Sequence, residues 1–204
     1  MNEYHKINSI FKRDGNGKII QSEFSKPEFE FLRSVDWLWT EKVDGTNIRV
    51  IWKDDTVTFA GKTDRASIPA KLANRLIELF PAEKFLNLTI HPDMCLYGEG
   101  YGAGIQKGGG NYSPIQDFVL FDVKIGDWWL RREDVEIIAD DLNIQVVPVV
   151  GKGDLLSAAT LANMGFQSHW GDFLAEGLVL TPEVPLRARS GERIIAKIKH
   201  RDFY

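Results

Sequence analysis

Eight short segments rich in β-branched and aromatic residues limit what this chain can fold into. Alternation of apolar and polar residues over four to eight positions is the sequence pattern of a β-strand. Asp14-Gly15-Asn16-Gly17 adds a turn signal that predicts a hairpin near the N-terminus. The expected strands are 37–42, 47–52, 56–60, 94–99, 117–123, 144–150, 176–181 and 193–199.

Helical spacing is confined to a few stretches. Two of them place apolar residues at i, i+3, i+4 and i+7: Ala73, Leu76, Ile77 and Phe80, and then Val135, Ile138, Ala139 and Leu142. Pro81 is expected to end the first helix. A third, shorter helix is predicted from about Asp154 to Met164, with Gly165 as its C-terminal cap. Many strands and few helices predict an α+β domain of mainly antiparallel sheets.

The composition indicates how many domains the chain forms and in which compartment it is expected. The 204 residues suit one domain with an ample core. Cys95 is the single cysteine, which excludes a disulfide framework within the chain and favours a reducing, cytoplasmic (intracellular) location. The N-terminal MNEYHKINSI lacks the apolar stretch of a secretory signal. No apolar run approaches the ~20 residues that span a bilayer, so no membrane association is expected.

The charge distribution is uneven. A formal net charge of −4 argues against a general nucleic-acid coat protein but allows a local basic groove. The stretch from Arg187 to Arg201 holds six basic residues against one acid, Glu192. This stretch fits either a solvated face or a surface for nucleic acid.

Residues 41–47, Glu-Lys-Val-Asp-Gly-Thr-Asn, contain the signature K-x-D-G at Lys42, Asp44 and Gly45. A lysine amine at such a site can attack a nucleotide phosphate, provided that a pocket or positive neighbours keep it unprotonated. The Asp-Gly pair supplies a turn and a nearby carboxylate. Four residues match by chance often, so this segment alone fits equally a solvated lysine before a β-turn.

Two further segments add candidate ligand contacts. Tyr97-Gly98-Glu99-Gly100 ends a strand and opens a glycine-rich loop that runs to Lys107. Glycines let the backbone approach a ligand, although the loop matches neither G-x-G-x-x-G nor a Walker A motif. Phe118 and Phe121 fall on opposite faces of a strand, so one can pack in the core while the other faces a ligand.

Two C-terminal segments carry charged groups. Glu176 opens the apolar strand Glu-Gly-Leu-Val-Leu. Lys197 and Lys199 alternate with Ala196 and Ile198, which places both ammonium groups on one face of a strand.

In order, these segments resemble five motifs of the covalent nucleotidyltransferase superfamily of ligases and RNA-capping enzymes. The likeness covers roughly residues 35–204 and is closest to the nick-sealing, type-2 ATP-dependent RNA ligases. Glu-Lys-Val-Asp-Gly-Thr-Asn, Tyr-Gly-Glu with the following Gly-Ile-Gln-Lys, and Ala-Glu-Gly-Leu-Val-Leu carry it. The resemblance implies a single nucleotidyltransferase (ATP-grasp-like) domain over residues 1–204, with mainly antiparallel sheets flanked by a few helices.

The resemblance also implies catalytic roles. Lys42 is expected to attack the α-phosphate of ATP and to become lysyl-AMP. Lys197 and Lys199 are expected to stabilise charge that develops on the phosphate. Glu176 resembles the family's metal-associated or pKa-tuning carboxylate, and Mg²⁺ (or Mn²⁺) is the implied metal. The implied partner is RNA with 5′-phosphate and 3′-hydroxyl ends, most simply a nicked duplex.

Seven residues are implied to bind the nucleotide: Glu41, Asp44, Gly45, Asn47, Lys62, Glu99 and Phe121. Glu99 resembles the acid that hydrogen-bonds the ribose, and Phe121 the aromatic that stacks on adenine. Glu41 lies at an adenine-side position, with its backbone as the expected contact. Asp44 and Gly45 belong to the K-x-D-G signature itself, Asn47 matches a position near the nucleotide or the RNA end, and Lys62 lies near the phosphate or ribose.

Three features depart from the family pattern. Lys62 replaces the usual arginine and loses its bidentate geometry. Thr181 stands where a lysine is common, and only five residues follow Lys199, so no C-terminal OB-fold or helical domain is expected in this chain. Two alternatives stay open: a lysyl-nucleotide transferase for another acceptor, including an RNA guanylyltransferase, and a non-catalytic module that binds nucleotide or RNA ends.

Overall fold

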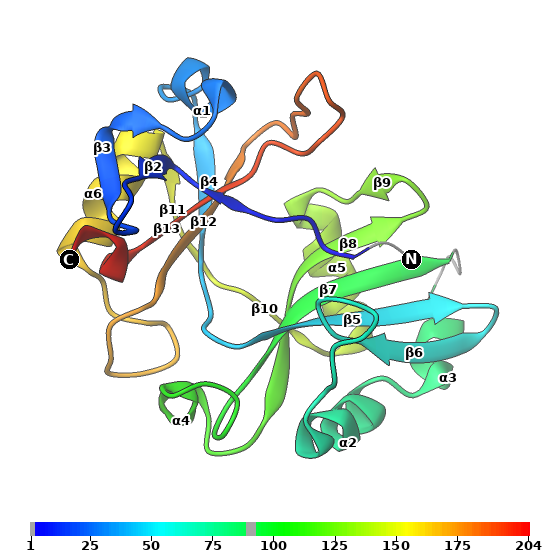
Figure 1. The fold of residues 1–204 in the computed structure, drawn as a ribbon. Coiled ribbons are helices and arrows are strands. Elements are labelled where there is room, and N and C mark those ends of the chain that lie inside the picture. Colours follow the sequence, from blue (N-terminus) through cyan, green and yellow to red (C-terminus); the bar gives the residue numbers. More distant parts are fainter. Residues whose placement is uncertain (1–2, 89–92) are drawn as a thin grey trace. The chain divides into compact units, whose positions relative to one another are not determined.

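A computed structural model describes residues 3–88 and 93–204, and its backbone divides into two compact units (Figure 1). The first unit comprises residues 1–5 and 44–147, and the second comprises residues 6–43 and 148–204. The chain therefore passes from one unit to the other three times. Each unit has its own sheet and its own hydrophobic core.

The first unit is built on a six-stranded sheet. Its strands pair in an antiparallel manner except for the parallel pair of β8 with β10. In spatial order they are β10 (Gln145–Val146), β8 (Asp117–Ile125), β7 (Met94–Tyr101), β5 (Thr46–Lys53) and β6 (Thr56–Ala60), with β9 (Trp128–Trp129) paired to β8.

Three helices cover one face of this sheet. They are α2 (Ala70–Leu79), α3 (Ala82–Leu86) and α5 (Arg132–Leu142), and they bury apolar residues against Ile48 and Val50 of β5 and Leu96 of β7. Trp52 stacks on Phe85 with ring centroids 5.0 Å apart. Because side chains alternate along a strand, Asn47, Arg49 and Glu99 lie on the opposite face. A fourth, short helix is α4 (Gly109–Tyr112).

The buried faces of the predicted helices are only partly those expected. All four residues named for α5 are buried, which confirms that prediction. In α2 the prediction was wrong for Ile77, which is 62% exposed, whereas Leu72, Leu76 and the following Phe80 are buried. The apolar stripe therefore runs at i, i+4 and i+8, and Ile77 lies one position outside it.

The second unit contains a five-stranded sheet and a separate hairpin. The sheet is antiparallel except for β1 beside β13, and its order is β1 (Asn8–Ser9), β13 (Ala196–Lys199), β12 (Gly177–Pro182), β4 (Trp37–Glu41) and β11 (Val149–Gly153). The hairpin joins β2 (Phe11–Arg13) to β3 (Ile19–Phe24). The predicted turn is confirmed, because Asp14 N–H donates to Lys18 O at 2.8 Å.

Helix α6 (Leu155–Met164) packs on this sheet through Leu155, Ala158 and Ala162, against Trp37 and Trp39. Asp154 caps its N-terminus by accepting from the N–H groups of Leu156 and Ser157, each at 2.9 Å. These hydrogen bonds hold the pKa of Asp154 below its usual value. Gly165 follows at φ 77°, so the predicted helix and its C-terminal glycine are both present. The short helix α1 (Pro27–Phe31) and the 3-10 helix η1 (His200–Phe203) complete the unit.

The prediction of one strand over 144–150 was wrong. Pro148 has no N–H for a ladder and ends the pairing there. Before it, β10 pairs with β8 of the first unit; after it, β11 pairs with β4 of the second. The strand predicted at 193–199 is shorter than expected and begins at Ala196.

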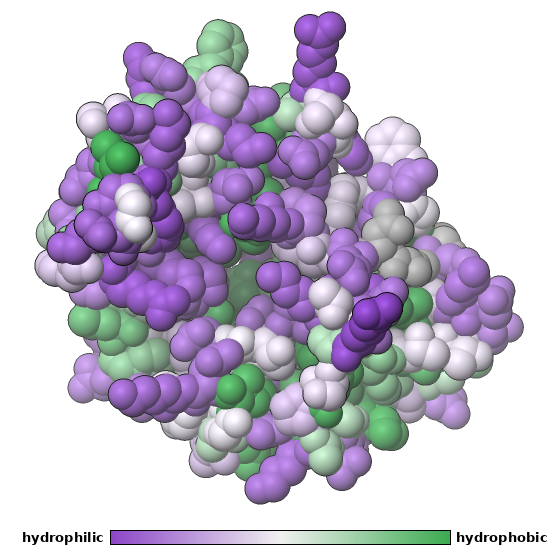
Figure 2. Space-filling model, in the orientation of Figure 1, coloured by the Kyte–Doolittle hydropathy of each residue, from purple (hydrophilic) through white to green (hydrophobic). Residues whose placement is uncertain are grey.

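The face in Figure 2 is mainly hydrophilic, with hydrophobic residues in small groups. None of the helices in the described part of the chain is both long and apolar enough to cross a membrane.

Candidate active site

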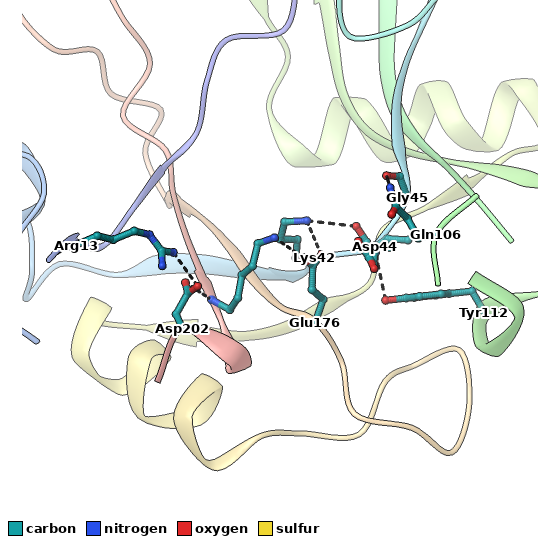
Figure 3. Close-up of polar contacts among 10 residues, drawn as sticks. Arg13, Lys42, Asp44, Gly45, Gln106, Tyr112, Glu176 and Asp202 are labelled. Atoms are coloured by element: carbon teal, nitrogen blue, oxygen red, sulfur yellow. Dashed lines mark hydrogen bonds and ion pairs between the residues drawn. The ribbon is translucent and has the colours of Figure 1, made fainter. Parts of the chain in front are cut away.

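Lys42 lies in an ion cluster with Glu176 and Lys199 in the second unit (Figure 3). Lys42 Nζ donates to Glu176 Oε2 at 2.5 Å, and Lys199 Nζ lies 2.5 Å from Glu176 Oε1. The three side chains are only 20%, 10% and 15% exposed. One carboxylate thus holds two ammonium groups close together in a place that is largely screened from water.

Backbone hydrogen bonds fix the three segments that carry this cluster. Lys42 N–H donates to Gly177 O at 2.9 Å, and His200 N–H donates to Glu176 O at 3.0 Å. Gly177 pairs with Lys199 across β12 and β13. Its φ is 153°, and a Cβ there would collide with the Ile198 carbonyl, so this close approach of strands requires glycine.

Strand β13 presents its lysines as the alternation predicted. Ala196 and Ile198 are fully buried in the core of the second unit, while Lys197 and Lys199 are on the other face and partly exposed. Lys199 touches Glu176, whereas Lys197 lies two residues earlier and pairs with Val179 of β12.

Glu41 points to the opposite face of β4 from Thr40, with the buried Trp37 and Trp39. Its carboxylate is 0% exposed and accepts from Ser168 Oγ at 2.6 Å and from His169 N–H at 2.9 Å, with His169 Nδ1 at 3.0 Å. The side chain therefore anchors the loop that leads to Glu176, and neither Ser168 nor His169 was predicted as its partner from the sequence. The backbone N–H of Glu41 donates to Pro148 O at 3.0 Å.

The first unit holds the remaining candidates, several of them on the sheet face that no helix of its core covers. Asn47 and Glu99 lie directly opposite one another on β5 and β7. Asn47 Oδ1 is buried and has no hydrogen-bond partner within residues 3–88 and 93–204. Such an acceptor is suited to a donor from a ligand, because burying it unpaired is costly.

Phe121 occupies a β-bulge. Tyr97 pairs with Asp122, and the next residue, Gly98, pairs with Leu120, so Phe121 is an extra residue in β8. Its ring packs edge-on against Tyr4 at 5.0 Å, and Tyr4 Oη donates to Asp122 Oδ2 at 2.5 Å. Bulges redirect side chains. Phe118 is instead buried in the core, as expected for one of the two phenylalanines.

Gln106 of the glycine-rich loop and Tyr112 of α4 hold the backbone that follows Val43. Asp44 N–H donates to Tyr112 Oη at 3.2 Å, and Gln106 Nε2 donates to Gly45 O at 2.9 Å (Figure 3). Sequence reasoning missed both side chains as contacts, although Gln106 belongs to the quoted Gly-Ile-Gln-Lys segment. These two contacts thus hold the backbone of the signature at Asp44 and Gly45.

Gly45 is expected to tolerate no side chain. A Cβ at this position would overlap Gly100 O and Glu99 Cγ. Gly45→Ala should therefore destabilise the protein by about 1–3 kcal/mol through overpacking, and should displace Glu99. Urea unfolding measures the first effect. Gly110→Ala is the control, since its Cβ meets only Ala103 Cβ at 4.0 Å; equal stability of the two variants would contradict the prediction.

Lys62 is exposed and follows β6 in a loop that a buried arginine holds. Arg49, 0% exposed, donates from Nε to Gly61 O at 2.9 Å and from Nη2 to Asp64 Oδ1 at 2.6 Å. This guanidinium keeps the pKa of the Asp64 carboxyl below its usual value. Arg49 thus contacts residues on both sides of Lys62: the backbone of Gly61 and the side chain of Asp64.

The donor set does not make a metal site by itself. Among the described residues no group of three or more His, Cys, Asp or Glu side chains could hold an ion. Glu176 is a single carboxylate. This fits Mg²⁺ or Mn²⁺ bound mainly by phosphate oxygens, because Mg²⁺ is commonly held by one or two carboxylates together with substrate phosphates.

Mainly antiparallel sheets with few helices make up a nucleotidyltransferase-like fold, in which the K-x-D-G lysine directly follows β4. The sequence model of the RNA ligase family matches residues 35–199, and the chain belongs to this family. Lys42, Glu176 and Lys199 all lie within the matched residues.

Solved structures of Naegleria gruberi RNA ligase share the fold. A mutant with ATP and Mn superposes with a TM-score of 0.69 at 20% sequence identity, covering 100% of this chain and 62% of that chain. A mutant with AMP and Mn gives 0.68 at 21% identity and covers 87% and 53%. The form with PPi gives 0.68 at 20% identity and covers 98% and 62%. The chain thus spans less than two thirds of the length of these structures.

Proposed function

We propose that this protein is an ATP-dependent RNA ligase that works through a lysyl-AMP intermediate on Lys42. The observation that carries the proposal is the cluster of Lys42, Glu176 and Lys199 within a chain of the RNA ligase family. Residues 1–204 act as one nucleotidyltransferase domain in this proposal. The buried single thiol of Cys95 suits an intracellular, cytoplasmic location.

In the first step, Lys42 Nζ gives up its proton to solvent water, and the neutral amine attacks the α-phosphorus of ATP. A P–N bond forms, the bond to the bridging oxygen of the β-phosphate breaks, and pyrophosphate leaves. Glu176 orients the amine, and Lys199, together with Lys197, stabilises negative charge on the phosphate oxygens as it develops. A divalent cation beside Glu176 would neutralise the leaving phosphates.

In the second step, a 5′-phosphate oxygen of RNA attacks the same phosphorus and releases Lys42, which leaves AMP joined to the RNA end through a pyrophosphate. In the third, a 3′-hydroxyl attacks the RNA phosphate, a phosphodiester forms and AMP leaves. A nicked duplex presents these two ends side by side, and we propose it as the substrate because proximity alone lowers the barrier to joining.

The polar face of the first unit provides the proposed nucleotide contacts. Phe121 stacks on adenine, Glu99 binds the ribose, and Asn47 Oδ1 accepts a hydrogen bond from the nucleotide or the RNA end. Lys62 contributes a point charge near the phosphate or ribose, and Asp44, Gly45 and the Glu41 backbone shape the approach. The buried unpaired acceptor of Asn47 supports this assignment.

The test separates the proposal from its alternatives. Incubation with α-labelled ATP or GTP and Mg²⁺, followed by intact mass and peptide mapping, should give one AMP adduct on Lys42. The adenylylated protein should then consume a nicked duplex with a 5′-phosphate. A GMP adduct would favour a guanylyltransferase, an adduct without joining would favour another acceptor, and no adduct would favour a binding module.

A basic hairpin between β12 and β13, residues 183–195, is the proposed contact for the RNA backbone. Arg187 and Arg193 pair across it, Ala188 N–H donates to Glu192 O at 2.8 Å, and Arg189 is exposed. Joint reversal of Arg187 and Arg189 to Glu should weaken sealing while AMP transfer stays nearly intact. The log–log salt slope of RNA binding should shrink by about two units, one for each lost phosphate contact.

The matched control changes the same number of charges elsewhere. Lys53→Glu with Lys71→Glu alters two exposed lysines of the first unit. If both double variants lose sealing equally at each salt concentration, the hairpin has no special role and only net charge matters.

A further inference from the structure

Arg13 and Asp202 form an ion pair between residues 189 positions apart in the chain, next to the ion cluster (Figure 3). Arg13 Nη2 donates to Asp202 Oδ1 at 2.7 Å, and the Asp202 side chain is only 4% exposed. Arg13 Nη1 also donates to Gly17 O at 2.7 Å, which closes the turn between β2 and β3. A buried carboxylate is costly unless paired, so Arg13 is a required partner for Asp202.

The second oxygen of Asp202 reaches the backbone of Lys199. Lys199 N–H donates to Asp202 Oδ2 at 3.1 Å. On that edge of β13 the neighbouring strand, β1, ends at Ser9, and Ile10 N–H makes the last bond, to Lys197 O at 3.0 Å. Asp202 Oδ2 therefore accepts the hydrogen bond from Lys199 N–H that a neighbouring strand would otherwise accept. This happens at the point where β13 ends and the 3-10 helix η1 begins.

On the opposite edge of β13, Lys199 and His200 contact the segment that carries Glu176. Lys199 pairs with Gly177, and His200 N–H donates to Glu176 O. His200 Nδ1 also lies 2.9 Å from Ala162 O at the end of α6. A shift of η1 would thus move the backbone of Lys199 and Glu176 together, and both carry side chains of the ion cluster.

We propose that Arg13 and Asp202 are positioning residues that set the Lys199 ammonium against Glu176. The inference rests on the proposed function for its effect on AMP transfer, but the placement of Lys199 is a separate, measurable property. Neither Arg13 nor Asp202 has a role in the reaction chemistry, and both act through the end of β13.

The placement is tested by lysine footprinting. Arg13→Ala should raise the rate at which an amine-selective acetylating reagent modifies Lys199 severalfold, because its ion pair with Glu176 loosens. Lys152, paired with Glu183 at 2.6 Å in the same unit, serves as the internal reference. Lys12→Ala breaks an exposed ion pair of the same hairpin and should leave Lys199 unchanged. Unchanged Lys199 reactivity in folded Arg13→Ala overturns the proposal.

The effect on chemistry is tested by a double-mutant cycle. Arg13→Ala should slow AMP transfer about tenfold or more. The Lys199 ammonium stabilises the transition state, and displacing it by even a fraction of an ångström lowers the rate. In a Lys199→Ala background the same change should have almost no further effect on the rate, while its effect on thermal stability persists. Equal slowing in both backgrounds means that Arg13 is only structural and overturns the proposal.

The positioning role of Arg13 can be tested even if Arg13→Ala does not fold or if the protein forms no lysyl-AMP. Where Arg13→Ala does not fold, Arg13→Lys is measured, since it keeps one donor for Asp202 and should shift Lys199 reactivity in the same direction by less. A wild-type protein that forms no lysyl-AMP would refute the proposed function, whereas the footprint would still decide whether the Arg13–Asp202 pair places Lys199.

Discussion

Lys42→Ala is expected to abolish transfer of AMP to the protein. The amine is the only group in the proposal that forms the P–N bond, and no neighbour replaces it: Lys199 is held at Glu176 by its own ion pair. Labelling with α-labelled ATP and Mg²⁺, read by intact mass, should fall below detection. Glu176 keeps Lys199 as a partner, so the variant should remain folded.

Lys42→Arg separates charge from nucleophilicity. Arginine keeps a cation beside Glu176 but stays protonated, so it cannot attack phosphorus. The variant should bind ATP and remain unlabelled. An adduct in either variant, mapped to another lysine, would refute the assignment of Lys42 and leave the family membership intact.

Lys199→Ala is expected to slow AMP transfer by about a hundredfold or more. The ammonium lies in a largely buried cluster, where a preorganised donor is worth much more than in water. The effect should appear in single-turnover formation of lysyl-AMP. Lys152→Ala is the control, because it removes an exposed lysine of the same unit and should leave the rate unchanged. A rate within a few-fold of wild type would remove Lys199 from the mechanism.

The neighbouring Ile198 should behave in the opposite way. Its side chain is fully buried in the core of the second unit, so Ile198→Ala should cost about 2–5 kcal/mol of stability. Below its lowered melting temperature the variant should still transfer AMP. Of two adjacent residues in β13, Ile198 would then affect stability and Lys199 the rate of AMP transfer.

Patterns of short range were enough to predict most of the fold. Alternation located the central strands, and it also placed Lys197 and Lys199 opposite Ala196 and Ile198. The apolar spacing of α5 matched its buried face. These features depend on which residues lie two to four positions apart, and a single sequence contains that information directly.

Features that depend on distant partners could not be predicted. Nothing near Arg13 in the chain indicates that its partner is Asp202, and nothing near Glu41 indicates Ser168 and His169. The strand predicted over 144–150 ran through Pro148, and nothing in the sequence marked Pro148 as the point where the chain leaves one unit for the other. The face of α2 was misplaced at Ile77 because Ala73 and Leu72 are both plausible core residues.

Phe121, the residue proposed to stack on adenine, is the extra residue of a β-bulge in β8, and the strand pairs with β7 on both sides of it. Gly98 pairs with Leu120 and Tyr97 with Asp122, so removal of Phe121 would leave two pairings that are already in register with each other. Deletions inside a strand usually turn every later side chain to the wrong face. Here a deletion would restore a regular ladder, and the strand could gain or lose this aromatic residue without rebuilding its sheet.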